Sequence, residues 1–322
     1  MRHIWFSYIA TSICLFLLAG LIMWYISPNI LAKSKVVSPL PSFLNLWENS
    51  QVSSIDLWFP KENIMQSLAL EKPQISAEAA IVYDLTSDTA LYTKNEHRKL
   101  PMASLTKIMT AIIALENKKE DDRYIVSKEN LVGEDSMGLG ENEILTQEEL
   151  LYGLMLPSGN DAAEVLASNY PLGREAFILA MNNKAKSFGL LDTHFTNSSG
   201  LQGDGKQYTT VYDLLIITKY AFEHFPLFQK IVETSEYQIP YSQTHKAFYL
   251  ENETNLLTTY PGVKGVKTGY TPEAGLCLAT YLDYNNHQII GVLLNSNNRR
   301  EDMKELLDYS LKVLGITPPS HG

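Results

Sequence analysis

The sequence predicts an α+β fold in which one antiparallel sheet is covered by helices. Two observations support it. Strand-like segments lie near both ends of the region that follows residue 74, whereas helix-like segments occupy its middle. The last two strand-like segments are joined by a tight turn, which pairs strands antiparallel. Runs of strands separated from runs of helices are typical of this fold class.

Composition excludes several classes of protein. Of 322 residues, 45% are hydrophobic and 19% are charged, which is the range of globular chains and not of disordered ones. The net charge of −10 excludes the basic surface that nucleic acid or anionic lipid requires. Two distant cysteines, Cys14 and Cys277, exclude a disulfide scaffold, and the scattered histidines form no metal-binding motif.

Residues 4–26 predict a membrane-spanning helix. They carry no charged side chain and exceed the roughly 20 residues that cross a bilayer. Aromatic residues lie near both ends of this stretch, as in interfacial belts. The stretch is longer than the apolar part of a signal peptide, and the best nearby cleavage site has an isoleucine where a small residue is wanted. We therefore expect an uncleaved anchor.

The remaining chain divides into a linker and one domain. Residues 1–3 form a short tail before the anchor. Residues 27–73 are rich in Pro, Ser and Asn and predict a linker that packs partly on the domain. Residues 74–318 predict one compact domain. Positive charges on the two sides of the anchor are nearly balanced, so charge alone does not fix its orientation.

The first elements of the domain are a hairpin and a helix. Apolar segments at 80–83 and 90–92 flank a polar turn at 86–89, which predicts two paired strands. Residues 104–117 have apolar side chains at helical spacing on most faces, which predicts a largely buried helix.

Helices fill the middle, and strands return near the end. Helices are expected at 148–156, at 161–169 after the break Pro157–Asn160, and at 174–188, before Gly189. Strands are expected at 265–271, 276–282 and 288–295, with a turn at 284–286, and an amphipathic helix at 301–314 closes the domain.

Three short motifs carry the candidate chemistry. They are Ser104-Leu105-Thr106-Lys107, Ser158-Gly159-Asn160 and Lys267-Thr268-Gly269, in that order. Ser104 and Lys107 are three residues apart and share a helix face. A serine needs an adjacent base, and a lysine serves as one only when burial or a second cation, such as Lys267, lowers its pKa. The start of a helix also favours an oxyanion.

The other motif residues suit substrate handling. Ser158 can pass a proton between the lysine and the leaving group, and the Asn160 amide can hold a substrate backbone. Lys267 and Thr268 offer a cation and a hydroxyl to a carboxylate. Gly269 leaves room for a ligand along a strand edge.

Each motif alone has an ordinary structural explanation. Ser104 could be a helix N-cap, Lys107 a solvated charge and Asn160 a turn residue, while the third motif could end a strand. The order of the three motifs and their fitting helix and strand contexts favour catalysis instead.

The chain resembles the D-alanyl-D-alanine carboxypeptidases, the low-molecular-mass penicillin-binding proteins, over about residues 75–316. These families share the three motifs with class A β-lactamases. The similarity extends along four segments: Pro101–Ala111, Leu156–Ala163, Phe195–Leu201 and Lys267–Gly275.

The resemblance implies a β-lactamase/DD-peptidase-like fold with a five-stranded antiparallel sheet. It implies that Ser104 is acylated, that Lys107 is the base and that Ser158 assists. It also implies substrate binding by Asn160, Lys267, Thr268, Gly269 and Arg299, although Arg300 adjoins the last, and an oxyanion hole made by the backbone N–H groups of Ser104 and Tyr270.

The activity implied is that of a serine-type D-Ala-D-Ala carboxypeptidase. It removes the terminal D-Ala from peptidoglycan stem pentapeptides, needs no metal or organic cofactor, and is acylated by β-lactams. Because the substrate is the cell wall, we expect a single-pass protein of the cell membrane with its catalytic domain outside the cytoplasm. Many family members carry a β-rich domain and a membrane helix after the catalytic domain; we expect neither here.

Several alternatives remain at this stage. A DD-endopeptidase acting on crosslinked peptidoglycan has the same motifs. A β-lactamase requires a Glu-x-x-x-Asn pattern, for which Glu251 with Asn255 is the candidate, but this pair is too close to Lys267. The intact motifs disfavour a non-catalytic wall-binding module. A Ser-His-Asp hydrolase and a P-loop protein lack their sequence frames.

Overall fold

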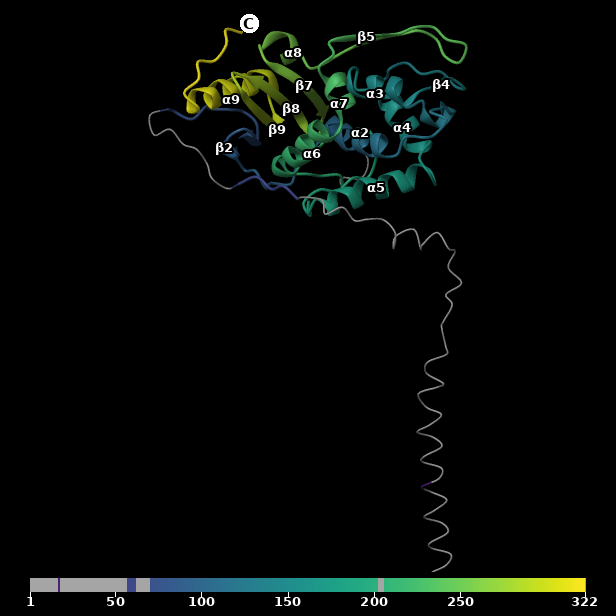
Figure 1. Cartoon of the computed structure of the whole chain (residues 1–322), viewed down its shortest axis with the longest axis horizontal. Helices are drawn as coiled ribbons and strands as arrows, with labels where there is room; N and C mark the ends of the chain where they lie inside the picture. The colour runs from purple at the N-terminus through teal and green to yellow at the C-terminus, as the bar shows by residue number, and fades with distance from the viewer. Residues whose placement is uncertain (1–16, 18–56, 62–69, 202–205, 322) are drawn as a thin grey trace, which may run out of the picture. The chain divides into compact units, whose positions relative to one another are not determined.

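A computed structural model describes residues 17, 57–61, 70–201 and 206–321. Its centre is a five-stranded sheet in the order β2-β1-β9-β8-β7, with every neighbouring pair antiparallel (Figure 1). The strands are β1 (Ala79–Asp84), β2 (Thr89–Lys94), β7 (Val263–Thr271), β8 (Gly275–Tyr284) and β9 (His287–Ser296). The predicted α+β class and the five-stranded antiparallel sheet are confirmed.

Helices and two small sheets complete the domain. The helices are η2 (Ala103–Leu105), α2 (Thr106–Glu116), η3 (Lys128–Asn130), α3 (Gln147–Met155), α4 (Asn160–Ser168), α5 (Arg174–Ser187), α6 (Val211–His224), α7 (Pro226–Val232), α8 (Leu256–Thr259) and α9 (Arg299–Val313). Strand β3 (Tyr124–Ile125) pairs with β4 (Ile144–Leu145), and β5 (Glu236–Ile239) pairs with β6 (Phe248–Glu251).

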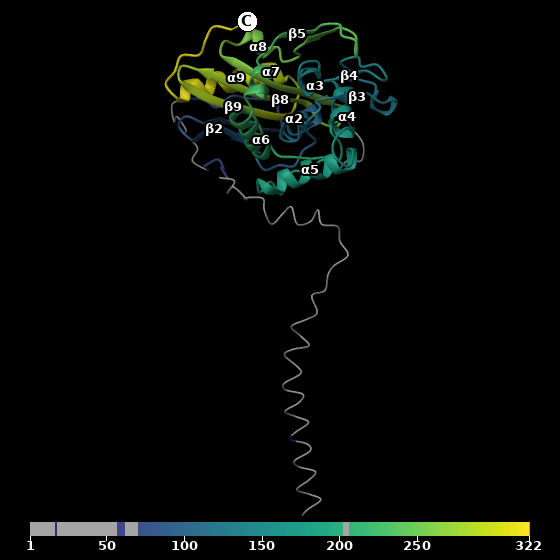
Figure 2. The same ribbon diagram turned by 45° about the vertical axis from the view of Figure 1, so that its right-hand side comes forward.

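The central sheet is buried on both faces. In β1, Ile81 and Tyr83 point into the core that contains α2 and α6, whereas Ala80 and Val82 point into the core beneath α9. This alternation follows from the two-residue period of a strand. Figures 1 and 2 show α9 on one face of the sheet and α2 and α6 on the other. The result is a three-layer domain.

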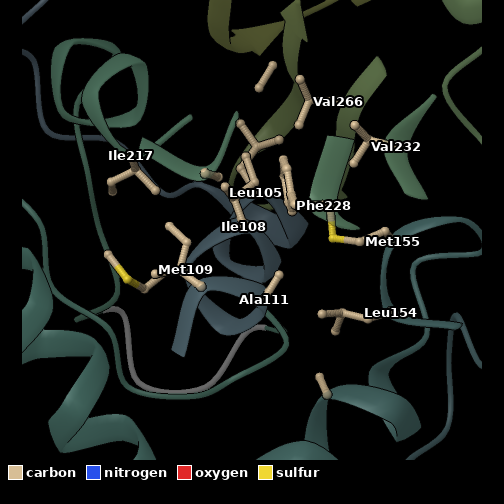
Figure 3. Close-up of a cluster of buried hydrophobic side chains, with 14 of the residues drawn as sticks. Leu105, Ile108, Met109, Ala111, Leu154, Met155, Ile217, Phe228, Val232 and Val266 are labelled. Carbon is tan, nitrogen blue, oxygen red and sulfur yellow. The ribbon is translucent and has the colours of Figure 1, made fainter. Parts of the chain in front are cut away.

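Helix α2 lies inside the larger of these cores. All its residues from Thr106 to Ala114 are buried. Figure 3 shows its apolar side chains surrounded by residues of other elements, including Leu154 from α3, Ile217 from α6 and Val266 from β7. A helix enclosed in this way holds any group at its N-terminus in a fixed position.

The sequence analysis missed α6 and α7. Helix α6 begins after Thr210, whose side chain accepts a hydrogen bond from the Asp213 N–H. This Thr-x-x-Asp pattern is a recognisable N-terminal signal. Helix α7 begins at Pro226, a favoured first residue of a helix.

Part of the predicted linker packs on the domain. The ring of Trp58 contacts Tyr83 edge-on, and Lys61 forms a 2.6 Å ion pair with Asp88. The described residues include no helix of the length and apolar character needed to cross a membrane. The predicted anchor at 4–26 lies outside the described residues, except for Leu17.

Candidate active site

Ser104 lies in η2, immediately before α2. Its side chain is only 8% exposed. The residue that caps η2 is Met102, and no side chain caps η2 or α2. The N-cap explanation for Ser104 is therefore excluded. Its hydroxyl instead accepts a hydrogen bond of 2.9 Å from Lys107 Nζ.

The Lys107 amine is buried and lies within hydrogen-bond distance of three oxygens. Besides Ser104, its Nζ donates to the Asn160 side-chain oxygen and to the Ser199 backbone oxygen, each at 2.7 Å. Burial lowers the pKa of Lys107 well below its ordinary value, and the positive charge of Lys267 lowers it further. The environment thus favours a neutral amine, which can donate to two of these oxygens and present its lone pair to the Ser104 hydroxyl.

Lys267 is the second buried cation of the site. Burial lowers its pKa to about 8, with Arg299 acting in the same direction and Glu253 opposing both. Its Nζ is buried and has no hydrogen-bond partner within the described part of the chain. A buried ammonium without a partner is costly. The site is therefore suited to receive an anion.

Ser158 and Asn160 come from the turn that starts α4. Ser158 is buried and has a left-handed backbone, with φ of +62°. The Asn160 amide nitrogen donates to the Glu134 carbonyl, while its backbone N–H donates to the Asp135 carbonyl. Asn160 thus joins Lys107 to a neighbouring loop, and its amide nitrogen already has a protein acceptor.

That loop, residues 133–140, is held by one carboxylate. Asp161 accepts hydrogen bonds from the Ser136 hydroxyl and from the backbone N–H groups of Met137, Gly138 and Leu139, at 2.5–3.1 Å. A carboxylate that satisfies several backbone donors rigidifies a segment that has no regular structure.

Strand β7 forms one edge of the sheet and lies against the Ser104 backbone. A Cβ at Gly269 would lie 3.0 Å from the Ser104 nitrogen. At Gly200, where φ is +90°, a Cβ would lie 2.0 Å from the Ala103 carbonyl oxygen. Both glycines therefore allow a close backbone approach. Tyr270, directly after Gly269, is 60% exposed.

Arg299 reaches the site through a contact with strand β7. Arg299 donates from Nη1 to the Gly269 carbonyl at 2.9 Å. Arg300 lies beside Glu301. Next to Gly269, the Thr268 hydroxyl faces the Glu253 carboxylate at 3.4 Å. The structure thus brings all the predicted site residues to the region between α2, α4 and β7.

Three contributors were missed by the sequence analysis. The Ser199 carbonyl and Gly200 belong to a segment whose similarity was recognised without a role, so the signal was present. Glu253 belongs to no motif. Glu251, the β-lactamase candidate, is an exposed residue of β6. Among the described residues, no group of three His, Cys, Asp or Glu side chains could hold a metal ion.

Comparison with known proteins gives one consistent family. The D-alanyl-D-alanine carboxypeptidase family profile matches residues 66–298. The D-alanyl-D-alanine carboxypeptidase DacF of Bacillus subtilis is 33% identical over 251 residues, covering 75% of this chain and 64% of the relative. The D-alanyl-D-alanine endopeptidase of Escherichia coli is 31% identical over 238 residues, covering 70% and 73%.

Solved structures agree with this result. The Streptomyces K15 DD-transpeptidase has a TM-score of 0.71 and 32% identity, covering 76% of this chain and 100% of that one. Penicillin-binding protein D2 from Listeria monocytogenes, in its cefotaxime-bound form, has a TM-score of 0.66 and 27% identity, covering 75% and 100%.

Proposed function

This chain belongs to the D-alanyl-D-alanine carboxypeptidase family, and we propose that it is a serine-type hydrolase that removes the terminal D-Ala from peptidoglycan stem pentapeptides. The observation that carries the proposal is the 2.9 Å contact between Lys107 Nζ and Ser104 Oγ in a buried setting. This is the arrangement of an activated nucleophile and its base.

The reaction proceeds through an acyl-enzyme. Neutral Lys107 takes the Ser104 proton as Oγ attacks the carbonyl carbon of the penultimate D-Ala. The backbone N–H groups of Ser104 and Tyr270 stabilise the resulting oxyanion. The tetrahedral intermediate expels the amine of the terminal D-Ala, which receives a proton through Ser158. Water then attacks the ester, releasing the shortened peptide and restoring the Ser104 hydroxyl.

The third motif binds the substrate. Its C-terminal carboxylate lies against Lys267, Thr268 and Arg299, which supply two charges and a hydroxyl. The peptide backbone extends along the edge of β7, where an added strand can pair. Gly269 keeps that edge close to Ser104. The Asn160 side chain orients Lys107 and contributes to substrate binding through the loop that it holds.

The same chemistry extends to related ligands. A β-lactam mimics the scissile amide, so it acylates Ser104; the Listeria relative bound to cefotaxime supports this proposal. The Escherichia coli relative named an endopeptidase supports a second candidate, cleavage of crosslinked stem peptides.

We further propose that residues 4–26 anchor the protein in the cell membrane. The apolar stretch and its aromatic ends support a single span. Because the substrate lies outside the cytoplasm, the catalytic domain lies there as well.

Release of D-Ala from a muramyl pentapeptide tests the proposed function. The purified full-length chain is compared with Ser104→Ala and with the control Ser187→Ala, which changes an α5 serine far along the chain from the motifs. We expect release by the first and third proteins only. No release by any of them, but cleavage of crosslinked peptidoglycan, would favour the endopeptidase. Equal release by Ser104→Ala would refute the nucleophile.

A further inference from the structure

Glu253 places a carboxylate beside the hydroxyl that we assign to substrate carboxylate binding. Its Oε2 lies 3.4 Å from Thr268 Oγ1. The Glu253 backbone N–H donates to the Leu156 carbonyl at the end of α3, so the main chain is fixed. The side chain itself is exposed to solvent. Because the backbone is fixed and the carboxylate is exposed, the Glu253 side chain can either contact Thr268 or rotate away from it into solvent.

The charge of Glu253 acts on all three cations of the site. Its negative charge raises the pKa of Lys107, Lys267 and Arg299, against the burial that lowers each of them. Lys267 Nζ has no hydrogen-bond partner among the described residues. Within the described part of the chain, Lys267 therefore has no anion in hydrogen-bonding contact, and Glu253 supplies a nearby negative charge.

We propose that Glu253 is a specificity-determining residue that competes with the C-terminal carboxylate of the substrate for Thr268 and the neighbouring cations. The inference rests on the proposed function, because it takes the substrate to be a peptide with a free carboxylate. Two carboxylates in one corner repel each other. An entering substrate carboxylate must displace the Glu253 side chain from Thr268.

Competition of this kind discriminates between ligands. A stem peptide gains contacts along β7 and at Ser104 that offset the displacement of Glu253. Released D-Ala and other small anions have only the carboxylate contact, so Glu253 weakens their retention. The side chain thus favours product release while leaving an extended substrate able to bind.

Three full-length proteins test this proposal: the wild type, Glu253→Gln and the control Glu251→Gln. The control removes the same charge two residues earlier, from an exposed position in β6. Each protein is assayed with a peptide ending in D-Ala-D-Ala and with its C-terminal amide, at the plateau of the pH profile. Thermal unfolding verifies that all three are folded.

We expect Glu253→Gln to raise kcat/KM for the carboxylate peptide about two- to fivefold, mainly by lowering KM. The effect is small because a solvent-exposed charge contributes little to binding. Free D-Ala should inhibit this variant more strongly. The gain should shrink at high salt, and it should be absent with the amide peptide and in Glu251→Gln.

Two results would overturn the inference: no gain with the carboxylate peptide, or an equal gain with the amide, which would show that Glu253 acts only through the pKa of Lys107. If the wild type releases no D-Ala, the proposed carboxypeptidase function is refuted, but this result does not decide whether Glu253 competes with a carboxylate. Calorimetric binding of the two peptides then still decides the question, since equal affinity of wild type and Glu253→Gln refutes competition.

Discussion

Lys107 Nζ and Asn160 Oδ1 lie 2.7 Å apart, so a single amide side chain connects the amine beside Ser104 to the loop at residues 133–140. The nitrogen of this amide donates a hydrogen bond to the Glu134 carbonyl of that loop. The position of the proposed base is therefore coupled to a segment more than twenty residues away along the chain. Changes at Asn160 should alter the chemistry of Lys107 directly.

Asn160→Asp should slow acylation at neutral pH. A carboxylate at this position stabilises the charged form of Lys107 and raises its pKa. Since the neutral amine is the active form, the acid limb of the rate profile moves to higher pH. The measurement is the rate of penicillin acylation across pH. Asn183→Asp, at an exposed position in α5, is the control; an unshifted acid limb in Asn160→Asp would contradict the assigned base.

Lys267→Arg should extend activity to higher pH. The pKa of Lys267 is lowered to about 8, so its charge is present below that pH and is lost as the pH rises through it. An arginine stays charged throughout. We expect kcat/KM to decline above about pH 8 in the wild type but not over the same range in the variant, whatever its absolute rate. An identical alkaline limb in both proteins would show that Lys267 does not set it.

Gly269→Ala should abolish most activity while leaving the fold intact. The added Cβ would lie 3.0 Å from the Ser104 nitrogen, which is tighter than most real contacts. It would push β7 away from the proposed oxyanion hole, and loss of one such donor costs about 10²–10³ in rate. Gly133→Ala is the matched control, because its Cβ meets no atom within 4 Å. Near-normal acylation by Gly269→Ala would argue against the proposed oxyanion hole.

Asp161→Asn should loosen the loop at residues 133–140. The amide offers one acceptor oxygen where the two carboxylate oxygens now accept from four donors of this loop and from the Ala162 N–H. Leaving buried donors unpaired costs about 1–3 kcal/mol. Urea unfolding should show that loss, and amide exchange at Met137–Leu139 should quicken. Asp192→Asn, in an exposed ion pair with Lys99, serves as the control; unchanged exchange in Asp161→Asn would exclude the anchoring role.

Removal of residues 1–36 should release the protein from membranes. The apolar stretch at 4–26 is the proposed anchor, and its loss removes the hydrophobic driving force for insertion. Fractionation of cells that express the full chain or the shortened one provides the measurement. Recovery of both forms in the membrane fraction would refute this assignment.

Much of this architecture could be predicted from the sequence because its signals are local. The strands β7, β8 and β9 have clear apolar runs and a turn, and α2 has apolar residues on most of its faces. All three motifs could be identified from the residue types, their spacing and their order. Direct hydrogen bonds join Lys107 to Ser104 of the same motif and to Asn160 of the second motif.

The remaining features depend on tertiary contacts that no local pattern reports. The Ser199 carbonyl accepts a hydrogen bond from Lys107, which lies 92 residues earlier in the sequence. Glu253 and Thr268 meet because α8 and the start of β7 return the chain to the site. The Asn160 amide, expected to hold the substrate backbone, also joins Lys107 to the Glu134 carbonyl, two contacts that the motif did not predict. Backbone acceptors and charge neighbours of this kind become visible only in the folded chain.

The enclosure of α2 bears on how long a covalent adduct persists. Ser104 is attached to a helix packed on all sides, so a drug bonded to its oxygen cannot be carried away from the pocket by movement of that helix (Figure 3). We expect water to reach the ester along β7, the edge strand of the central sheet. An inhibitor whose side groups shield that edge should form a longer-lived adduct than one that leaves it uncovered.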